Sequence, residues 1–250
     1  MRENRLYTTQ PLAAGIDLTL ESRPARHASQ VLRLAQGDAL VVFNGDGRDY
    51  RARVTQAGRG EFSVRTIDAT DPEPLPALEI RLALGISRGE RMDLAIQKSV
   101  ELGAGAIQPL FTSRSVVRLH GDRLLKRAEH WLGVIIAACE QCGRRYLPSL
   151  TPAAFLDDWL QPGHPGGILL HHAAARTITE LPPPARGLTL LVGPEGGLAA
   201  DERDRAQALG FTPVRLGPRV MRTETAPLAA IAAIQALWGD FRPTSREGLT

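Results

Sequence analysis

One stretch near the C-terminus, residues 188–238, constrains the fold more than any other part of the chain. It begins with an apolar run at 188–192, which is too short for a helix and is typical of a buried strand. A glycine-rich loop at 193–197 follows, and then a helical segment with Asp201 and Glu202 in its first turn, where the helix dipole favours acids. The stretch thus starts with a strand, a loop and a helix.

The same order then repeats, with a strand at 212–216, a loop at 217–222 and a helix from about Thr223 to Trp238. Two such units in tandem predict an α/β fold with a parallel sheet, whose ligand binds at the carboxyl ends of the strands. Glycines at that edge let main-chain N–H groups approach a ligand closely. On glycine content alone, two tight turns without a ligand are an equal alternative.

The spacing of the glycines argues against two common phosphate-binding motifs. No Gly-Lys-Ser/Thr triplet follows them, so a P-loop is not predicted. Gly193, Gly196 and Gly197 do not match Gly-x-Gly-x-x-Gly, and that fingerprint would normally open its domain rather than fall in the last quarter of the chain. A nicotinamide-dependent oxidoreductase therefore fits the α/β pattern but not the fingerprint.

Composition limits the class of protein. The chain has 250 residues, of which 43% are hydrophobic, so it can bury a sizeable core in one or two domains. No apolar run is long enough to cross a membrane, and no apolar segment follows the N-terminus, so we expect a cytoplasmic protein. The net charge of +3 permits nucleic-acid binding without arguing for it.

Metal and thiol chemistry are not predicted. Cys139 and Cys142 form a C-x-x-C pair, but no second pair or histidines at suitable spacing could complete a zinc site. His171 and His172 are neighbours that would point apart on a strand, and lone histidines are more often structural than catalytic. We expect ordinary thiols and leave both histidines out of the chemistry.

Residues 1–70 show several short strands separated by turns, which predicts a small β-barrel. Asn44-Gly45-Asp46-Gly47 is a strong hairpin signal, and the alternation after it places Arg51 and Arg53 on one face. A proline-rich joint at 70–76 marks a boundary, so we predict domains at 1–72 and 73–250. Basic residues precede the barrel as a solvated or RNA-binding face: Arg23, Arg26, His27 and Arg33.

Beyond the joint, strands at 78–85 and 106–110 flank a helix at 92–102, the βαβ order of a parallel sheet. A long helix at about 122–142 follows. Its predicted apolar stripe comprises Leu125, Ala128, Leu132, Ile135 and Cys139. Basic residues around its start form either a solvated face or a phosphate-binding one: Arg114, Arg118, Arg123, Lys126, Arg127 and His130.

The amino-acid sequences of the two loops closely resemble the motifs of one family. The segments are Leu191-Val192-Gly193-Pro194-Glu195-Gly196-Gly197-Leu198 and Leu216-Gly217-Pro218-Arg219-Val220-Met221-Arg222-Thr223-Glu224-Thr225-Ala226. They are similar to the RsmE family, bacterial SPOUT methyltransferases that methylate N3 of a uridine in 16S ribosomal RNA. Glu140-Gln141-Cys142-Gly143-Arg144 resembles that family's Glu-Gln-x-Gly-Arg signature. Nearly the whole chain shares the resemblance.

This resemblance implies a C-terminal trefoil knot, an N-terminal PUA-like barrel, a homodimer, 16S RNA of the 30S subunit as partner and S-adenosylmethionine as cofactor. It implies RNA contacts at Arg23, Arg26, His27, Arg33, Arg51, Arg114 and Arg144, of which Arg144 is also a candidate contact to the dimer partner. The implied cofactor-binding residues are Leu170, Gly193, Pro194, Glu195, Gly196, Gly197, Leu216, Gly217, Val220, Met221, Arg222, Thr223 and Ala226. The apolar helix at 226–238 fits a dimer interface or a buried helix equally well.

The implied reaction must remove the weakly acidic N3 proton, so a base or an anion stabiliser would help. Arg222 is the candidate to orient the uracil or stabilise charge on its oxygens. Glu195 or Glu224 could take the proton, although one is also a turn residue and the other a helix-start acid. The alternative function is a non-catalytic RNA-binding or ribosome-assembly factor on the same scaffold.

Overall fold

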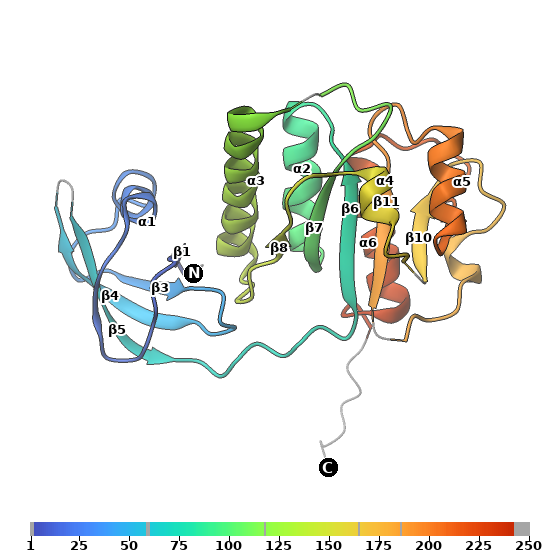
Figure 1. The fold of residues 1–250 in the computed structure, drawn as a ribbon. Helices are drawn as coiled ribbons and strands as arrows, with labels where there is room; N and C mark the ends of the chain where they lie inside the picture. The colour runs from blue at the N-terminus through green and yellow to red at the C-terminus, as the bar shows by residue number, and fades with distance from the viewer. Residues whose placement is uncertain (1–2, 59–60, 118, 165, 186, 243–250) are drawn as a thin grey trace, which may run out of the picture. The chain divides into compact units, whose positions relative to one another are not determined.

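A computed structural model describes residues 3–58, 61–117, 119–164, 166–185 and 187–242. The chain forms two compact units, Met1–Leu75 with Ile136–Leu147, and Pro76–Ile135 with Pro148–Thr250. Each unit has a sheet of its own (Figure 1).

Short alternating strands build the sheet of the first unit. Its strand order is β1-β3-β4-β5-β2, with β1 parallel to β3 and the other pairs antiparallel. The strands are β1 (Arg5–Tyr7), β2 (Asp17–Thr19), β3 (Ala39–Phe43), β4 (Tyr50–Ala57) and β5 (Phe62–Ala69). The predicted hairpin joins β3 to β4, and Gly45 and Gly47 both have the positive φ that such a turn favours. Alternation in β4 exposes Arg51 and Arg53, as predicted.

The basic cluster lies on a short irregular helical segment of this unit. Helix α1 (Ser22–Arg26) continues into a π-helical turn, η1 (His27–Val31). Arg33 follows with φ of +55°, the one described non-glycine residue in the left-handed region. Such geometry is uncommon for a side chain of this size and is often found at functional sites.

A distant segment completes the first unit. The buried carboxylate of Glu140 accepts a hydrogen bond from Tyr7 N–H (3.0 Å) and lies 3.4 Å from His27 Nδ1. Arg145 Nε donates to Asp49 (3.2 Å), and Arg5 bonds the same Asp49 carboxylate oxygen. These pairs join residues 136–147 to strands that lie roughly a hundred residues earlier in the chain.

The second unit is an α/β structure with a parallel sheet, as predicted. Its strand order is β12-β10-β11-β6-β7-β8, and β9 also pairs with β7. The strands are β6 (Glu79–Gly85), β7 (Ala104–Phe111), β8 (Ser149–Leu150), β9 (Ala154–Phe155), β10 (Gly167–Leu170), β11 (Gly187–Val192) and β12 (Phe211–Val214). The helical segments are α2 (Gly89–Glu101), α3 (Gly121–Cys142), α4 (Leu156–Leu160), η2 (Ile178–Glu180), α5 (Ala200–Ala208) and α6 (Thr225–Trp238).

Helices cover both faces of this sheet (Figure 1). On one face α4 and α5 pack over a core that includes Leu169, Leu191 and Phe211. On the other, α6 packs against α2, and its buried residues include Ala230, Ile231 and Ile234. Both tandem units of the sequence are present, but β10 lies between β11 and β12, an arrangement that local patterns did not reveal.

The predicted apolar stripe of α3 is partly wrong. Leu125 and Leu132 are exposed, by 64% and 39%, whereas Trp131, Ile135 and Cys139 are buried. Apolar character alone could not separate the two sides, because this helix carries large aliphatic residues on both. The prediction of a long helix ending at Cys142 is confirmed.

Candidate active site

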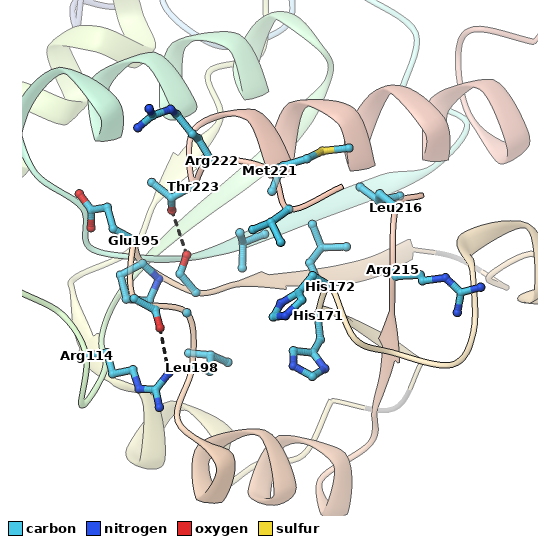
Figure 2. A pocket seen from close by; sticks show the side chains of 18 of the residues that line it. Arg114, His171, His172, Glu195, Leu198, Arg215, Leu216, Met221, Arg222 and Thr223 are labelled. Carbon is cyan, nitrogen blue, oxygen red and sulfur yellow. Dashed lines mark hydrogen bonds between the residues drawn. The ribbon is translucent and has the colours of Figure 1, made fainter. Parts of the chain in front are cut away.

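Three parallel strands end at the same edge of the sheet and form a cavity there. Strands β10, β11 and β12 run parallel, so the loops that follow Leu170, Val192 and Val214 meet. The cavity has a volume of about 440 Å³ and lies between the glycine loop and the loop before α6 (Figure 2). Ligand pockets in α/β folds typically occupy this position.

The glycine loop has no room for side chains at its tightest point. A Cβ on Gly193 would lie 2.8 Å from Leu198 N, and a Cβ on Gly85 of the neighbouring strand would lie 2.5 Å from the Pro194 ring. Gly197 has φ of +67°, and its N–H donates to Pro194 O (2.8 Å). Main-chain groups therefore come to the cavity wall, as the sequence predicted.

A buried hydroxyl fastens the two loops together. Thr223 Oγ1 donates to Gly193 O (3.0 Å) and lies 3.3 Å from Ser87 Oγ, which follows β6 (Figure 2). Thr223 is only 8% exposed. Because water cannot replace this hydrogen bond easily, the two walls of the cavity are held at a fixed separation.

Glu195 belongs to the glycine loop, but its carboxylate bonds the start of α2. Its Oε1 accepts the Arg88 N–H (3.0 Å) and lies 3.7 Å from Arg91 Nη1. Burial favours the protonated carboxyl, but main-chain hydrogen bonds from Arg88 and from Glu195 itself, with the Arg91 charge, outweigh it and lower the pKa of Glu195. The group is a stable anion that ties the loop to a helix.

Arginine dominates the charge of the cavity wall. The lining arginines are Arg91, Arg114, Arg203, Arg215, Arg219 and Arg222, and Glu195 is the only carboxylate among the described lining residues. Main-chain carbonyls hold three of them: Gly196 O holds Arg114 (3.0 Å), Leu198 O holds Arg203 (2.6 Å) and Ala174 O holds Arg215 (2.8 Å). Arg219 and Arg222 are exposed, and their guanidinium groups make no hydrogen bond or ion pair with the described parts of the chain. The site therefore favours an anionic ligand or a developing negative charge.

Both histidines that sequence reasoning set aside line this cavity. The prediction that they point apart is wrong, because β10 ends at Leu170 and the alternation of a strand no longer applies. Their ring centroids lie 5.1 Å apart in an edge-on arrangement. The signal that could have found them is their position directly after a strand of the parallel sheet.

The structure brings nearly all the predicted cofactor-binding residues together. The cavity is lined by Leu170, Gly193, Pro194, Glu195, Gly196, Gly197, Leu216, Val220, Met221, Arg222, Thr223 and Ala226. Gly217 and Glu224 are absent from this lining. Glu224 directly precedes α6, with one carboxylate oxygen buried and without a hydrogen-bond partner among the described residues.

The residues proposed to contact RNA are distributed over both units. Arg23, Arg26 and His27 lie on the α1–η1 segment, and Arg33 follows it. Arg51 forms a bidentate pair with Asp68 (2.7 and 2.6 Å). The carbonyl of Arg144 accepts a bond from Arg5 (3.0 Å), and Arg114 lines the cavity of the second unit. Arg118 lies outside the described residues.

Cys139 and Cys142 both lie on α3 and are free thiols. Burial, with a smaller effect from Cys142, raises the pKa of Cys139 to about 12, so its thiol stays protonated at neutral pH. Among the described residues no group of three or more histidine, cysteine or acidic side chains could hold a metal ion. No described helix is both long and apolar enough to cross a membrane.

Two family models match the chain. An RNA methyltransferase domain matches residues 73–235, and an RNA methyltransferase PUA domain matches residues 23–67. Together they cover most of the chain: the first spans all strands of the second sheet, and the second spans β3, β4 and most of β5 of the first sheet. The fold and the cavity thus define an RNA methyltransferase with an N-terminal PUA domain.

Individual relatives narrow this class. Ribosomal RNA small subunit methyltransferase E of Buchnera aphidicola subsp. Schizaphis graminum is 31% identical over 239 residues, 95% of this chain and 97% of the relative. A solved structure of the Neisseria gonorrhoeae enzyme of the same name, bound to S-adenosyl methionine, has a TM-score of 0.89 and 35% identity, over 96% of this chain and 100% of that one. A Legionella pneumophila structure with bound cofactor SAM has a TM-score of 0.92 and 37% identity, with the same coverage. The chain belongs to the ribosomal RNA small subunit methyltransferase E family.

Proposed function

We propose that this protein transfers a methyl group from S-adenosylmethionine to N3 of a specific uridine in 16S ribosomal RNA. The observation that carries the proposal is the meeting of two glycine-containing loops in one cavity, fastened by the Thr223–Gly193 hydrogen bond. The related Neisseria gonorrhoeae enzyme, solved with this cofactor and named for the small-subunit RNA, supports both the cofactor and the substrate.

The residues of the cavity fit this cofactor. A volume of about 440 Å³ lies within the range of small-molecule sites, and apolar side chains such as Leu170, Leu216 and Met221 suit a flat base. Main-chain groups of the two loops can pair with the edge of adenine, and the lining arginines can pair with a carboxylate. Gly193, Gly196 and Gly197 would hold it on one side, and Leu216, Val220, Thr223 and Ala226 on the other.

Bound S-adenosylmethionine supplies an activated methyl group, so the work of the chain is alignment and charge stabilisation. Arg222 is exposed at the cavity and unpaired among the described residues, which suits a group that orients the uracil and stabilises charge on its oxygens. Glu195 is engaged by Arg88, and the role that fits it is to hold the glycine loop. Glu224 is a weaker candidate for proton transfer, because it is absent from the lining of the cavity.

We assign RNA binding to residues 1–72 and methyl transfer to residues 73–250. In this assignment the RNA contacts Arg23, Arg26, His27, Arg33, Arg51, Arg114 and Arg144. Because Arg51 is paired with Asp68, it must either leave that carboxylate or bind the RNA through its exposed side. The family resemblance supports a homodimer that acts in the cytoplasm on the 30S subunit.

Methyl transfer to 30S subunits from cells that lack this modification tests the proposal. An N3 methyl blocks base pairing, so transfer from labelled S-adenosylmethionine should give one new reverse-transcription stop in 16S RNA. Incorporation without that stop would show a different RNA position as the target. If cofactor binding and incorporation are both absent, the non-catalytic RNA-binding alternative is favoured instead.

A matched pair of glycine variants checks that the signal comes from this site. Gly193→Ala introduces a Cβ within 2.8 Å of Leu198 N and should abolish cofactor binding. Gly133→Ala lies on α3, where a Cβ meets nothing within 4 Å, and should leave cofactor binding unchanged.

A further inference from the structure

The proposed reaction needs a group that accepts the N3 proton, and the cavity offers few. Arginine side chains stay protonated, so the described lining residues provide only Glu195, His171 and His172 as acceptors. Glu195 Oε1 is held by the Arg88 N–H at 3.0 Å and lies 3.7 Å from Arg91 Nη1, and Oε2 is buried from solvent without a hydrogen-bond partner among the described residues. We therefore assign this carboxylate to holding the start of α2 rather than to proton transfer. The two imidazoles are the remaining proton acceptors among the described lining residues.

His171 is the better positioned of the two. Its N–H donates to Val214 O (2.9 Å), which extends the pairing of β10 with β12 by one residue and fixes the backbone. His171 is half-buried, whereas His172 is exposed. Figure 2 shows both rings in the space enclosed by the glycine loop and the loop before α6. A fixed, partly desolvated imidazole at a cavity wall is a suitable general base.

The surroundings keep this imidazole neutral. Burial, the charge of Arg203 on α5 and the neighbouring His172 lower the pKa of His171, so its nitrogen lone pair is available at neutral pH. The same cationic wall makes loss of a proton from a bound uracil easier, because it stabilises the anion. The other charged groups that line the cavity are Arg91, Arg114, Glu195, Arg215, Arg219 and Arg222.

We infer that His171 is the catalytic base that takes the N3 proton of the target uridine, an inference that rests on the proposed function. The N3–H bond breaks and its proton passes to an imidazole nitrogen of His171. The electron pair left on N3 forms the bond to the methyl carbon, and the carbon–sulfur pair returns to sulfur, which becomes a neutral thioether. The imidazolium then loses its proton to solvent when the product leaves.

Single-turnover methylation of 30S subunits over about pH 5.5 to 9.5 tests this inference, because general-base catalysis is visible in the pH profile. For the unmodified protein we expect the rate to fall with unit slope below the pKa of His171. His171→Asn and His171→Gln should lose about 10²–10⁴-fold in rate at neutral pH, the usual contribution of a general base. Their rates should then climb with pH as N3 ionises without help.

Two further readouts do not depend on the rate of methylation. Calorimetric titration with S-adenosylmethionine should give the same affinity for His171→Asn as for the unmodified protein, which separates base catalysis from cofactor binding. An NMR titration of the imidazole protons should place the pKa of His171 below 6.5, the usual value for histidine, because burial and the charge of Arg203 disfavour the protonated ring. This titration, with the pH profile of the unmodified protein, decides the matter even if the variants do not fold.

A more acidic substrate provides a rescue test. In 30S subunits rebuilt with 5-fluorouridine RNA, the N3 proton is lost more easily, so the His171 variants should recover most of their deficit. The His172→Asn variant should still show the fall in methylation rate below the pKa of His171 that we expect for the unmodified protein. The inference is overturned if the His171 variants stay within threefold of the unmodified protein at every pH, or if their loss follows weaker cofactor binding. Absence of N3 methylation by the unmodified protein would instead refute the proposed function, and this inference with it.

Discussion

At the scale of single residues, the cavity depends on a small number of buried polar contacts. Thr223 joins the two loops through Gly193 O, and Glu195 joins one of them to α2 through the Arg88 N–H. The guanidinium groups of Arg219 and Arg222, in contrast, have no partner among the described residues, and both residues are exposed near Val220, which is itself 75% exposed. The walls are thus fixed, while the charged groups at the rim are free to bind a substrate.

Replacement of Thr223 by valine should loosen both loops. The variant keeps the volume but leaves Gly193 O without its donor, so we expect the free energy of unfolding to fall by about 1–2 kcal/mol. Cofactor affinity should fall with it, because the loops must then be ordered on binding. Urea denaturation and calorimetry measure the two effects. Thr223→Ser keeps the hydroxyl and should restore both, and an equal loss in serine and valine variants would contradict the role of this hydrogen bond.

Replacement of Arg222 by alanine should affect the chemical step. If its guanidinium stabilises charge on the uracil, the single-turnover rate should fall by about 10²–10³-fold while 30S binding changes little. Arg222→Lys should recover only part of the rate, because an ammonium cannot make the two parallel bonds of a guanidinium. A full rate for Arg222→Ala with normal cofactor binding would remove this residue from the mechanism.

Arg219→Ala is the matched comparison for that variant. It removes a similar unpaired charge from the same loop, but we expect weaker RNA binding rather than slower chemistry. The slope of log K against log salt concentration should decrease in magnitude by about one, the value for one lost phosphate contact. Filter binding to 16S RNA at several salt concentrations measures it.

At the scale of elements, the end of α3 is a structural anchor. Glu140 is buried, and its carboxylate accepts a hydrogen bond from the Tyr7 N–H of β1 and lies beside His27 of η1. The same element carries Cys139, which is buried and protonated, and exposed Cys142 one turn later. The Glu-Gln-x-Gly-Arg segment suggested RNA contact through Arg144, and its glutamate also stabilises the first unit.

Removal of the Glu140 carboxylate should destabilise the first unit. Glu140→Ala leaves the Tyr7 N–H without its acceptor, and we expect a loss of about 1–3 kcal/mol in the free energy of unfolding. Hydrogen exchange at the β1 amides should quicken at the same time. Glu140→Gln keeps an acceptor oxygen and should lose less. Cys142→Ser is an exposed substitution on the same helix and should change stability by less than about 0.5 kcal/mol.

At the scale of the whole molecule, one of the two units is made from two separate pieces of chain. Residues 136–147 belong with Met1–Leu75, although they follow α2 and β7 of the other unit in sequence. Helix α3 consequently starts in one unit and ends in the other. The trefoil knot that the resemblance implies stays a prediction.

A fragment that ends at Leu75 should fail to fold stably. It would keep the buried Asp49 and Arg5 but lose Arg145, Glu140 and the carbonyl of Arg144 that contact this region. Far-UV circular dichroism and dispersion of amide signals in an NMR spectrum should show a largely unfolded chain. A fragment in which a short linker joins residues 136–147 to the same piece should fold. A fully folded 1–75 fragment would show that this segment is dispensable.

Local signals predicted the elements well, and long-range pairing was beyond them. The apolar run before Gly193 and the glycine spacing after it predicted β11 and the loop correctly, because backbone preference is encoded locally. The position of β10 between β11 and β12 depends on hydrogen bonds between distant segments, which no local pattern contains. For the same reason the sequence placed residues 136–147 beyond a boundary at the prolines, while their contacts group them with the first unit.

The sequence predicted most residues of the candidate site but not the hydrogen bonds between them. The two loops were identified from their amino-acid sequences, and the structure brings twelve of the predicted cofactor-binding residues, Leu170 of β10 included, to one cavity. Sequence could not indicate that Glu195 caps α2, because Arg88 lies 107 residues away. It also set aside His171, because a histidine that follows a short strand has no distinguishing pattern until the neighbouring strands are known.

The divided construction of the first unit has a consequence for protein synthesis. Its N-terminal piece leaves the ribosome first but lacks its partners until Leu147 has been made, 72 residues after Leu75 (147 − 75). At the usual elongation rate of about 5–20 residues per second, this delay lasts roughly 4–14 s. During that interval the nascent chain exposes the surface that Glu140 and Arg145 later cover. We therefore expect the N-terminal piece to stay incompletely folded until residues 136–147 emerge, so that the order of translation affects how this enzyme reaches its native state.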